Sequence, residues 1–307
     1  MIPAQGRQRG FSKQRDGTAQ PDERMSAKPP GNQAGKQPGD PQAIRRRGER
    51  EEQARAAQGV DLEALLYDPS PGVLAAVLDN PRLNERHLTV LLARRDLPRE
   101  TAAAIAQNKE WMKSYRLKAA AARHPRMPQH LAMAQLKYLY LFDLVGISTT
   151  AGVPAQVKRA AEDAILSQKE GIALGERTAM ARRCSGRIAA ALLGDADRRV
   201  VEVALGNPGL TGHAVAAAVV RESAFPHLAE AVERHQRWSV LREVRLALLR
   251  SRHLPLARLM GILGGLNRRD LADLAEDPRA PASLRSYVQR TLQAQRNPGT
   301  QSARKGL

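Results

Sequence analysis

Residues 68–83, DPSPGVLAAVLDNPRL, recur as DADRRVVEVALGNPGL at residues 195–210, which lie 127 positions later. Both segments begin with aspartate, continue through an apolar stretch and reach an Asn-Pro pair, Asn80-Pro81 or Asn207-Pro208. The same offset relates further identities: Trp111 and Trp238, Pro128 and Pro255, Asp143-Leu144 and Asp270-Leu271, and Pro154-Ala155 and Pro281-Ala282. A constant spacing over this length predicts two tandem copies of a 127-residue unit, without insertion or deletion.

The hydrophobic pattern of both copies is typical of short helices. Val73, Leu74, Val77 and Leu78 have helical spacing and are followed by Asn80-Pro81, where a helix is expected to end. Only 3% of the residues are aromatic, so the core must consist of Ala, Leu and Val, and Ala and Leu favour helices. We expect helices over 42–57, 99–107, 111–123, 128–145 and 154–168, and over 198–205, 211–221, 226–235, 239–250, 255–266 and 281–295.

Proline marks the start of many of these segments. The first turn of a helix tolerates proline because its N–H groups have no intrahelical partner. Pro98, Pro128, Pro154, Pro226, Pro255 and Pro281 all fit that position. Helices this short cannot bury an apolar stripe alone, whereas stacked pairs bury a continuous core. We therefore predict an all-α fold, an α-solenoid of short paired helices with about six helices in each copy.

The expected organisation has four parts. Residues 1–41 are rich in Gln, Gly, Pro, Lys and Arg and almost free of aliphatic side chains, so they are predicted to be a disordered basic tail. Residues 42–174 form the first solenoid copy, and residues 175–295 form the second, continuous with the first. Residues 296–307 are predicted to be another disordered basic tail.

The quoted punctuation resembles that of known helical repeats. Asp68-Pro69-Ser70-Pro71-Gly72-Val73 followed by Leu78-Asp79-Asn80-Pro81-Arg82-Leu83 is similar to the leucine-rich repeat variant and to the broader HEAT/armadillo-like superfamily. The second copy lacks the prolines at the positions of Pro69 and Pro71. Including 111–115 and 141–144, the whole pattern resembles an uncharacterised bacterial repeat family. The resemblance implies an armadillo-type fold and binding of other macromolecules, and it supplies no activity.

Charge points to anionic partners. The chain carries 49 Lys and Arg against 31 Asp and Glu, a formal net charge of +18. Such a balance attracts nucleic acids, anionic membranes or acidic proteins, although an Arg- and Ala-rich composition also follows from a GC-rich genome. The most apolar long segment, 131–147, is interrupted by Lys137 and Asp143 and falls short of a membrane span. We expect a cytoplasmic protein.

Motifs for catalysis and cofactor binding are missing from the sequence. There is no phosphate-binding loop, no dinucleotide fingerprint and no zinc-binding His-Glu-x-x-His helix. His227, Glu230 and Glu233 have helical spacing, which suits either a metal site or a solvated charged face. Gly261, Gly264 and Gly265 are interpreted as small residues that allow close helix packing. We predict that the chain is not an enzyme and uses no cofactor.

Two rarer residue types allow both a structural and a functional interpretation. The single cysteine, Cys184, follows Arg182-Arg183, and neighbouring arginines can lower a thiol pKa and make it reactive. A buried thiol is the simpler hypothesis, because the counterpart in the first copy is Ala57. The duplicated tryptophans, Trp111 and Trp238, are either stacking platforms for bases or anchors between helices, and duplication in a repeat favours anchors.

The arginines are the best candidates for a functional surface. Several are kept in both copies, and we select Arg94, Arg123, Arg182, Arg221 and Arg250 as partner- or phosphate-binding candidates. Arginine suits acidic protein partners as well as phosphates, and ion pairs on a solvated helix surface are the structural alternative. Our first hypothesis is a non-catalytic scaffold that binds a protein partner through its concave surface. The second is a nucleic-acid-binding HEAT-like protein with a basic Arg-rich face, and the third, a HEAT-like enzyme on nucleic acid, is disfavoured by the few aromatic residues.

Overall fold

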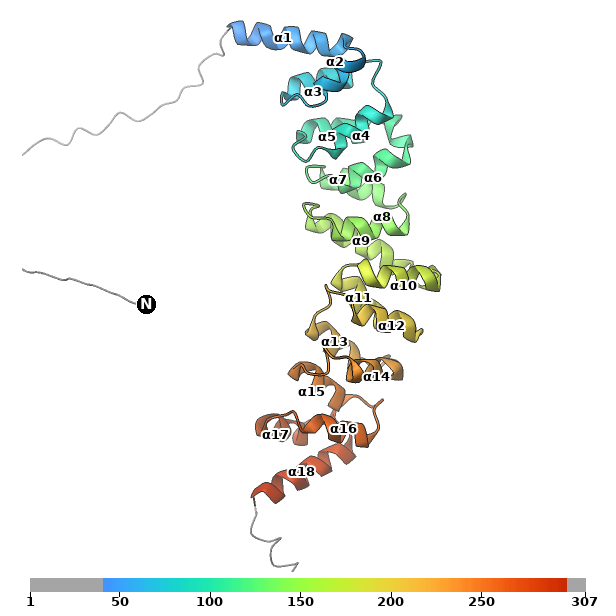
Figure 1. Cartoon of the computed structure of the whole chain (residues 1–307), viewed down its shortest axis with the longest axis vertical. Helices are drawn as coiled ribbons and strands as arrows, with labels where there is room; N and C mark the ends of the chain where they lie inside the picture. The colour runs from blue at the N-terminus through green and yellow to red at the C-terminus, as the bar shows by residue number, and fades with distance from the viewer. Residues whose placement is uncertain (1–40, 297–307) are drawn as a thin grey trace, which may run out of the picture. The chain divides into compact units, whose positions relative to one another are not determined.

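The structure is a computed structural model that describes residues 41–296, with side chains from 45 to 294. Those residues are all-helical and contain no strand. Figure 1 shows the order of the α-helices. Their bounds are α1 Pro41–Ala56, α2 Gly59–Leu65, α3 Pro71–Leu78, α4 Glu85–Ala93, α5 Arg99–Gln107, α6 Tyr115–Arg123, α7 Gln129–Leu136, α8 Leu141–Thr149, α9 Ala155–Ser167, α10 Leu174–Arg183, α11 Gly186–Leu192, α12 Arg198–Leu205, α13 Gly212–Val219, α14 Pro226–Arg234, α15 Arg242–Arg250, α16 Leu256–Leu263, α17 Arg268–Glu276 and α18 Ala282–Arg296, with two 3₁₀ helices, η1 Trp111–Lys113 and η2 Lys169–Gly171.

Packing between helices is local in sequence. Among the described residues, every α-helix pair in extensive contact consists of neighbours or next-but-one neighbours along the chain, such as α8 with α9, α10 with α12 and α13 with α15. The buried Leu, Ala and Val residues nevertheless form a hydrophobic cluster that extends from Ala54 to Val288. Each short helix therefore shares its apolar face with the helices just before and after it.

The helix bounds recur with the spacing found in the sequence. Six helix pairs agree at both ends when 127 is added to the residue numbers: α2 and α11, α3 and α12, α5 and α14, α6 and α15, α7 and α16, and α8 and α17. The pairs α4 and α13, and α9 and α18, agree at their first residue, and α1 and α10 agree at their last. Equivalent sequence positions thus adopt equivalent local structure.

Buried asparagines tie the turns to the preceding helices in the same way at both positions. Asn80 Nδ2 donates to the carbonyl oxygens of Ala54 at 2.8 Å and Ala57 at 3.0 Å. Asn207 Nδ2 donates to those of Ala181 at 2.8 Å and Cys184 at 3.0 Å. The other amide atom, Oδ1, accepts the N–H two residues later in each case. In each segment the asparagine amide therefore satisfies three backbone groups.

The six prolines lie where the sequence predicts helix starts. Pro226 is the first residue of α14, and the other five directly precede α5, α7, α9, α16 and α18. Their fixed φ suits the entry into a helix, and their missing N–H leaves no donor unpaired there. In several of these turns the residue just before the proline is a buried apolar one, as at Leu97, Met127 and Leu254. These three turns therefore both start a helix and contribute to the core.

The structure is more finely divided than predicted. Nine α-helices lie within residues 41–167 and nine within 174–296, compared with the six expected in each copy. The expected helix 128–145 is two helices, α7 and α8, separated at residues 137–140. Leu139 is buried in this break, and the Tyr140 N–H donates to Tyr115 Oη at 3.0 Å instead of to a helix carbonyl. Tertiary contacts thus compensate for the interrupted helix.

The interpretation that three glycines allow close helix packing is not supported, because at Gly265, which lies after the end of α16, the neighbour is the end of the flexible Arg245 side chain. A Cβ at Gly261 would meet nothing within 4 Å, and at Gly264 it would meet only a carbonyl of its own helix, so neither allows close helix packing. At Gly265 a Cβ would collide with the Arg245 guanidinium, which donates to the Gly265 carbonyl at 3.1 Å. Within residues 41–296, none of the helices combines the length and the apolar character needed to cross a bilayer.

Candidate functional site

A groove of about 680 Å³ lies between α8, α10 and α12. Phe142 from the first turn of α8 forms one wall and is 50% exposed. The remaining lining residues are Leu174, Gly175, Thr178, Ala179, Arg182 and Arg183 from α10, and Arg199 from α12. The groove therefore combines an apolar floor with three guanidinium groups.

Helical periodicity explains how α10 forms most of this groove. Leu174, Thr178 and Arg182 are spaced by four residues and lie along one side of the helix. Gly175, Ala179 and Arg183 form the adjacent row at the same spacing. The two small residues leave space above the backbone, and a Cβ at Gly175 would meet nothing within 4 Å. The arginines therefore stand at the end of an open channel along α10.

The charges of the groove are only partly neutralised. Arg182 and Arg183 are exposed and form no ion pair with any residue between 45 and 294. Arg199 pairs with Asp197 at 2.9 Å, and its side chain is 71% exposed. The lining contains no carboxylate. An anion entering this groove would meet three cations without displacing more than one internal partner.

The region 127 residues earlier in the sequence is chemically different. The positions equivalent to Leu174 and Thr178 are Arg47 and Glu51 of α1, which form an ion pair at 2.9 Å. These two side chains cover Gly72, the equivalent of Arg199, since a Cβ there would collide with both of them. The open basic groove is therefore specific to α10 and α12 and does not follow from the repeated helix pattern.

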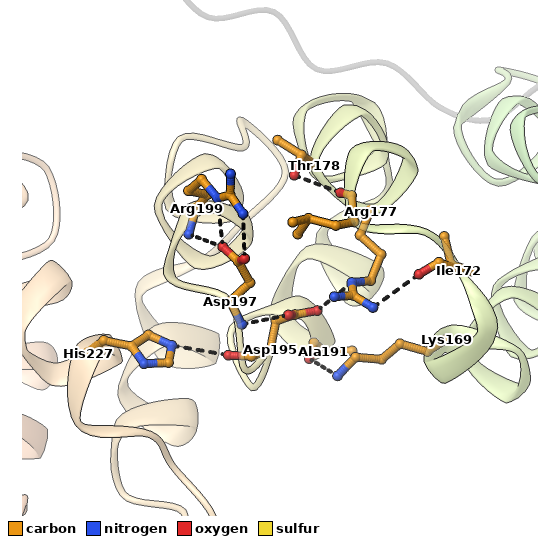
Figure 2. A network of polar contacts seen from close by, with 10 residues as sticks. Lys169, Ile172, Arg177, Thr178, Ala191, Asp195, Asp197, Arg199 and His227 are labelled. Carbon is orange, nitrogen blue, oxygen red and sulfur yellow. Dashed lines mark hydrogen bonds and ion pairs between the residues drawn. The ribbon is translucent and has the colours of Figure 1, made fainter.

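A polar network connects the helices that line the groove, and Figure 2 shows its residues. Asp195, only 3% exposed, lies in the turn before α12, and its Oδ2 is 3.1 Å from Arg177 Nε of α10. The Arg177 Nη1 donates to the Ile172 carbonyl at 3.0 Å, and the Asp195 carbonyl lies 3.1 Å from His227 Nε2 at the start of α14. The network holds the turn before α12 against α10 and α14, which sets the position of Arg199. Arg50 and Asp68 form the equivalent ion pair at 3.6 Å.

Asp197 caps the N-terminus of α12 and binds the Arg199 side chain. Its side chain accepts the Arg199 N–H at 2.9 Å as the N-cap of the helix, and it also accepts from the Arg199 guanidinium (Figure 2). The Arg199 side-chain hydrogen bonds and then its backbone N–H lower the pKa of Asp197 to about 2. Both members of the pair therefore stay charged at any physiological pH.

Arg94 serves the fold rather than an open surface. Its Nη1 donates to the Leu66 carbonyl and, at 3.3 Å, to the Asp68 carbonyl, while Nη2 pairs with Asp96 at 2.8 Å. The side chain is 10% exposed. Because its donors are engaged, Arg94 connects the turn before α3 to the end of α4 and has little capacity for a further ligand.

The other selected arginines divide into paired and exposed ones. Arg123 pairs with Asp143 at 2.5 Å, and Arg250 pairs with Asp277 at 2.7 Å, so both fit the ion-pair alternative. Arg221 is exposed and has no ion-pair partner among the residues whose side chains are described. Of the five candidates only Arg182 lines the groove. The structure does not bring the five together in one site.

The tryptophan positions support the anchor interpretation, most clearly for Trp238. Trp238 is 1% exposed, and its Nε1 donates to the Leu205 carbonyl at 2.8 Å. It therefore cannot serve as a stacking platform for bases. Trp111 is half-buried and packs against the core in the 3₁₀ helix η1. Trp238 is therefore more deeply buried than Trp111.

The spaced His227, Glu230 and Glu233 have separate partners. His227 contacts the Asp195 carbonyl, Glu230 lies 3.6 Å from Arg234, and Glu233 pairs with Arg258 at 3.1 Å. No group of three or more metal-ligating side chains occurs among the described residues. The solvated charged face is thus the better interpretation of this spacing.

Cys184 is buried rather than activated. The thiol is 5% exposed beside the Asn207 amide, and burial, the largest cause, raises its pKa to about 12. The arginines before it point into the groove and do not offset this effect. Cys184 therefore occupies a small packing position, like its counterpart Ala57.

We expect native Cys184 to react with Ellman's reagent at pH 8 about a thousandfold more slowly than the same thiol in guanidinium chloride. A pKa near 12 leaves about a thousandth of the thiolate present in a free cysteine. The rate of absorbance change with and without denaturant measures this. A native rate equal to that of a free thiol would show that the cysteine is accessible and ionised.

Sequence reasoning identified part of the groove. Arg182 is among the selected candidates and Arg183 adjoins it in the sequence, whereas Arg199 was not selected and comes from α12, the next helix but one after α10. Phe142 carried no functional signal, because only packing decides which of several apolar residues in α8 stays exposed. No family model, curated protein or solved structure shows a significant match to this chain, so the resemblance to HEAT/armadillo-like and leucine-rich repeat variant proteins stays a prediction.

Proposed function

We propose that this chain is a non-catalytic helical-repeat scaffold that binds a protein partner. In this proposal it is an α-solenoid built from two tandem copies, residues 42–174 and 175–295, that share one continuous core. Support comes from the helix bounds that recur at an offset of 127 and from contacts confined to neighbouring and next-but-one helices. Both are expected of stacked repeats. The repeated Asn80 and Asn207 hydrogen bonds support the duplication independently of helix assignment.

The groove between α8, α10 and α12 carries the functional part of the proposal. It places the exposed Phe142 beside Arg182 and Arg183. At the equivalent positions of α1, the Arg47–Glu51 ion pair covers the corresponding surface. Exposed aromatic and arginine side chains in a hollow are typical of protein-binding hot spots. The lining contains no acid, histidine or cysteine.

Nucleic-acid binding is the alternative that a specific observation favours. The net charge of +18 and the open arginines would attract a phosphate backbone, and binding would then weaken steeply with salt. Nucleic acid also offers bases that could stack on Phe142. The two functions differ in what the groove contacts, so the experiment has to identify the bound polymer.

A photo-crosslinking amino acid at Ala179, in the exposed row of the groove, tests the proposal in an extract of the source cells. We expect the full chain to form a discrete crosslinked product that protease removes and nuclease does not. The product should disappear when Arg182→Glu and Arg183→Glu are introduced together, because charge reversal disfavours an acidic partner. The matched control is Arg252→Glu, since Arg252 is exposed, lies outside the groove and has no ion-pair partner within the described part of the chain.

The position of the crosslinker has its own control. Val60 in α2 is 81% exposed and does not line the groove, so a crosslinker there should not give the same product. A nuclease-sensitive product at Ala179 would replace the protein partner by nucleic acid. A protease-sensitive product that survives the double charge reversal would show that a protein partner lies at the groove but does not depend on Arg182 and Arg183.

A further inference from the structure

We infer that the groove between α8, α10 and α12 takes an acidic peptide segment, with an apolar side chain against Phe142 and Leu174 and carboxylates on Arg182, Arg183 and Arg199. The inference rests on the proposed function and specifies the chemistry of the partner. Three observations support it. The groove has an apolar floor, its lining contains three arginines and no carboxylate, and the neighbouring hollow is lined by two glutamates.

The apolar part of the groove matches one or two large side chains. Phe142, one of only three phenylalanines in the chain, is half exposed. Leu174 and Ala179 extend the apolar floor along α10. A volume of about 680 Å³ lies in the range of sites that enclose compact ligands. Covering Phe142 would remove apolar surface from water and so contribute to affinity.

The three guanidinium groups specify carboxylates on the occupant. Arginine presents a planar set of donors that binds carboxylate or phosphate through two parallel hydrogen bonds. Arg182 and Arg183 have these donors free of protein carboxylates within residues 45–294, and Arg199 keeps most of its surface exposed beside Asp197. A basic or neutral peptide would leave these charges partly desolvated without compensation.

The neighbouring surface favours a short acidic segment over a polyanion. A second hollow of about 480 Å³ is lined by Leu141 of α8 and Glu176 of α10, next in the chain to residues of the groove. Glu170 also lines it, and both glutamates are exposed. A phosphate chain that extends past the groove in this direction would approach carboxylates, and like charges repel it. A peptide can end its acidic residues at the groove and continue with apolar or basic ones.

Peptide display on the immobilised full chain tests the inference without assuming a partner. A random library should be enriched for peptides that combine several Asp or Glu residues with a large apolar residue. The same library on the Arg182→Glu, Arg183→Glu double variant should lose that enrichment. A library with no acidic preference, or the same acidic peptides on both proteins, would overturn the inference.

The best enriched peptide, labelled with fluorescein, then measures each contribution by anisotropy. We expect the double charge reversal to weaken binding at least about tenfold and Phe142→Ala about fivefold, whereas Arg252→Glu should leave it unchanged. All of these side chains are exposed, and circular dichroism should show unchanged helicity. If the charge reversals weaken peptide binding but Phe142→Ala does not, the proposed contact between an apolar peptide side chain and Phe142 is wrong.

The same anisotropy measurement with labelled single-stranded DNA at near-physiological salt tests the nucleic-acid alternative. Groove-dependent binding of DNA, lost in the double variant, would overturn the acidic-peptide inference. If instead neither probe binds but the Ala179 crosslink to protein persists and depends on the arginines, the scaffold proposal stands and the acidic-peptide class is wrong. If the crosslink to protein is also absent, both fail.

Discussion

Replacing Trp238 with alanine should lower the free energy of unfolding by about 3–5 kcal/mol. The side chain is 1% exposed and is the largest of the fully buried side chains. Its removal would leave a cavity between helices and deprive the Leu205 carbonyl of the indole N–H, which now lies 2.8 Å away. The Arg237 guanidinium, 4.1 Å from the ring centroid, would lose its cation–π contact as well. Urea unfolding followed by circular dichroism measures the change.

The duplicate residue provides the control. Trp111 is half-buried and its indole donates no hydrogen bond within the described structure, so Trp111→Ala should cost clearly less than Trp238→Ala. Trp238→Phe should fall between them, because phenylalanine fills most of the volume but leaves the Leu205 carbonyl unpaired. Equal losses for the two alanine variants would mean that burial in the two copies is the same, contrary to the structure.

The second large effect is expected for Asn207→Ala, which should cost about 3 kcal/mol. Asn207 is 1% exposed, and alanine would leave the Cys184 carbonyl and the Gly209 N–H without partners and the Ala181 carbonyl with only the weak Cys184 thiol donor at 3.7 Å. Buried backbone groups without partners are costly because water cannot replace the lost bonds. The change in the urea midpoint, with its slope checked for constancy, gives the value.

Two further substitutions separate the role of the amide from that of the turn. Asn207→Asp keeps the acceptor for Gly209 but places an oxygen against two carbonyls, so it should destabilise at least as much as alanine. Asn108→Ala should cost less than about 1 kcal/mol, because Asn108 Oδ1 accepts only from Glu110 and Trp111 in its own turn. If Asn108→Ala and Asn207→Ala cost the same, the bonds between helices contribute nothing.

Much of the local structure could be predicted from single residues. Pro98, Pro128 and Pro255 start helices because proline has no N–H to lose there and its φ already suits a helix. The break between α7 and α8 could not be predicted, since the segment reads as one apolar helix. Only the Tyr115 hydroxyl, contributed by α6, satisfies the Tyr140 N–H after the helix ends.

The candidate site shows the same division. The sequence gives no reason to treat the five selected arginines differently: Arg94, Arg123, Arg182, Arg221 and Arg250. In the structure, three of them, Arg94, Arg123 and Arg250, bind carboxylates or carbonyls of neighbouring turns. The sequence could not distinguish these from Arg182, because their partners lie about 20 or more residues away or depend on the exact path of a turn.

By itself the sequence determined that residues 41–296 are helical, where several of the helices begin, and that two segments repeat at a spacing of 127, because helix propensity, proline geometry and residue spacing act over a few neighbouring residues. The tertiary structure decided that Cys184 and Trp238 are buried, that Arg94 is engaged, and that Phe142 and Arg182 share a groove. Burial, and the choice of ion-pair partner, depend on which helices meet, and that is set by packing between segments tens of residues apart.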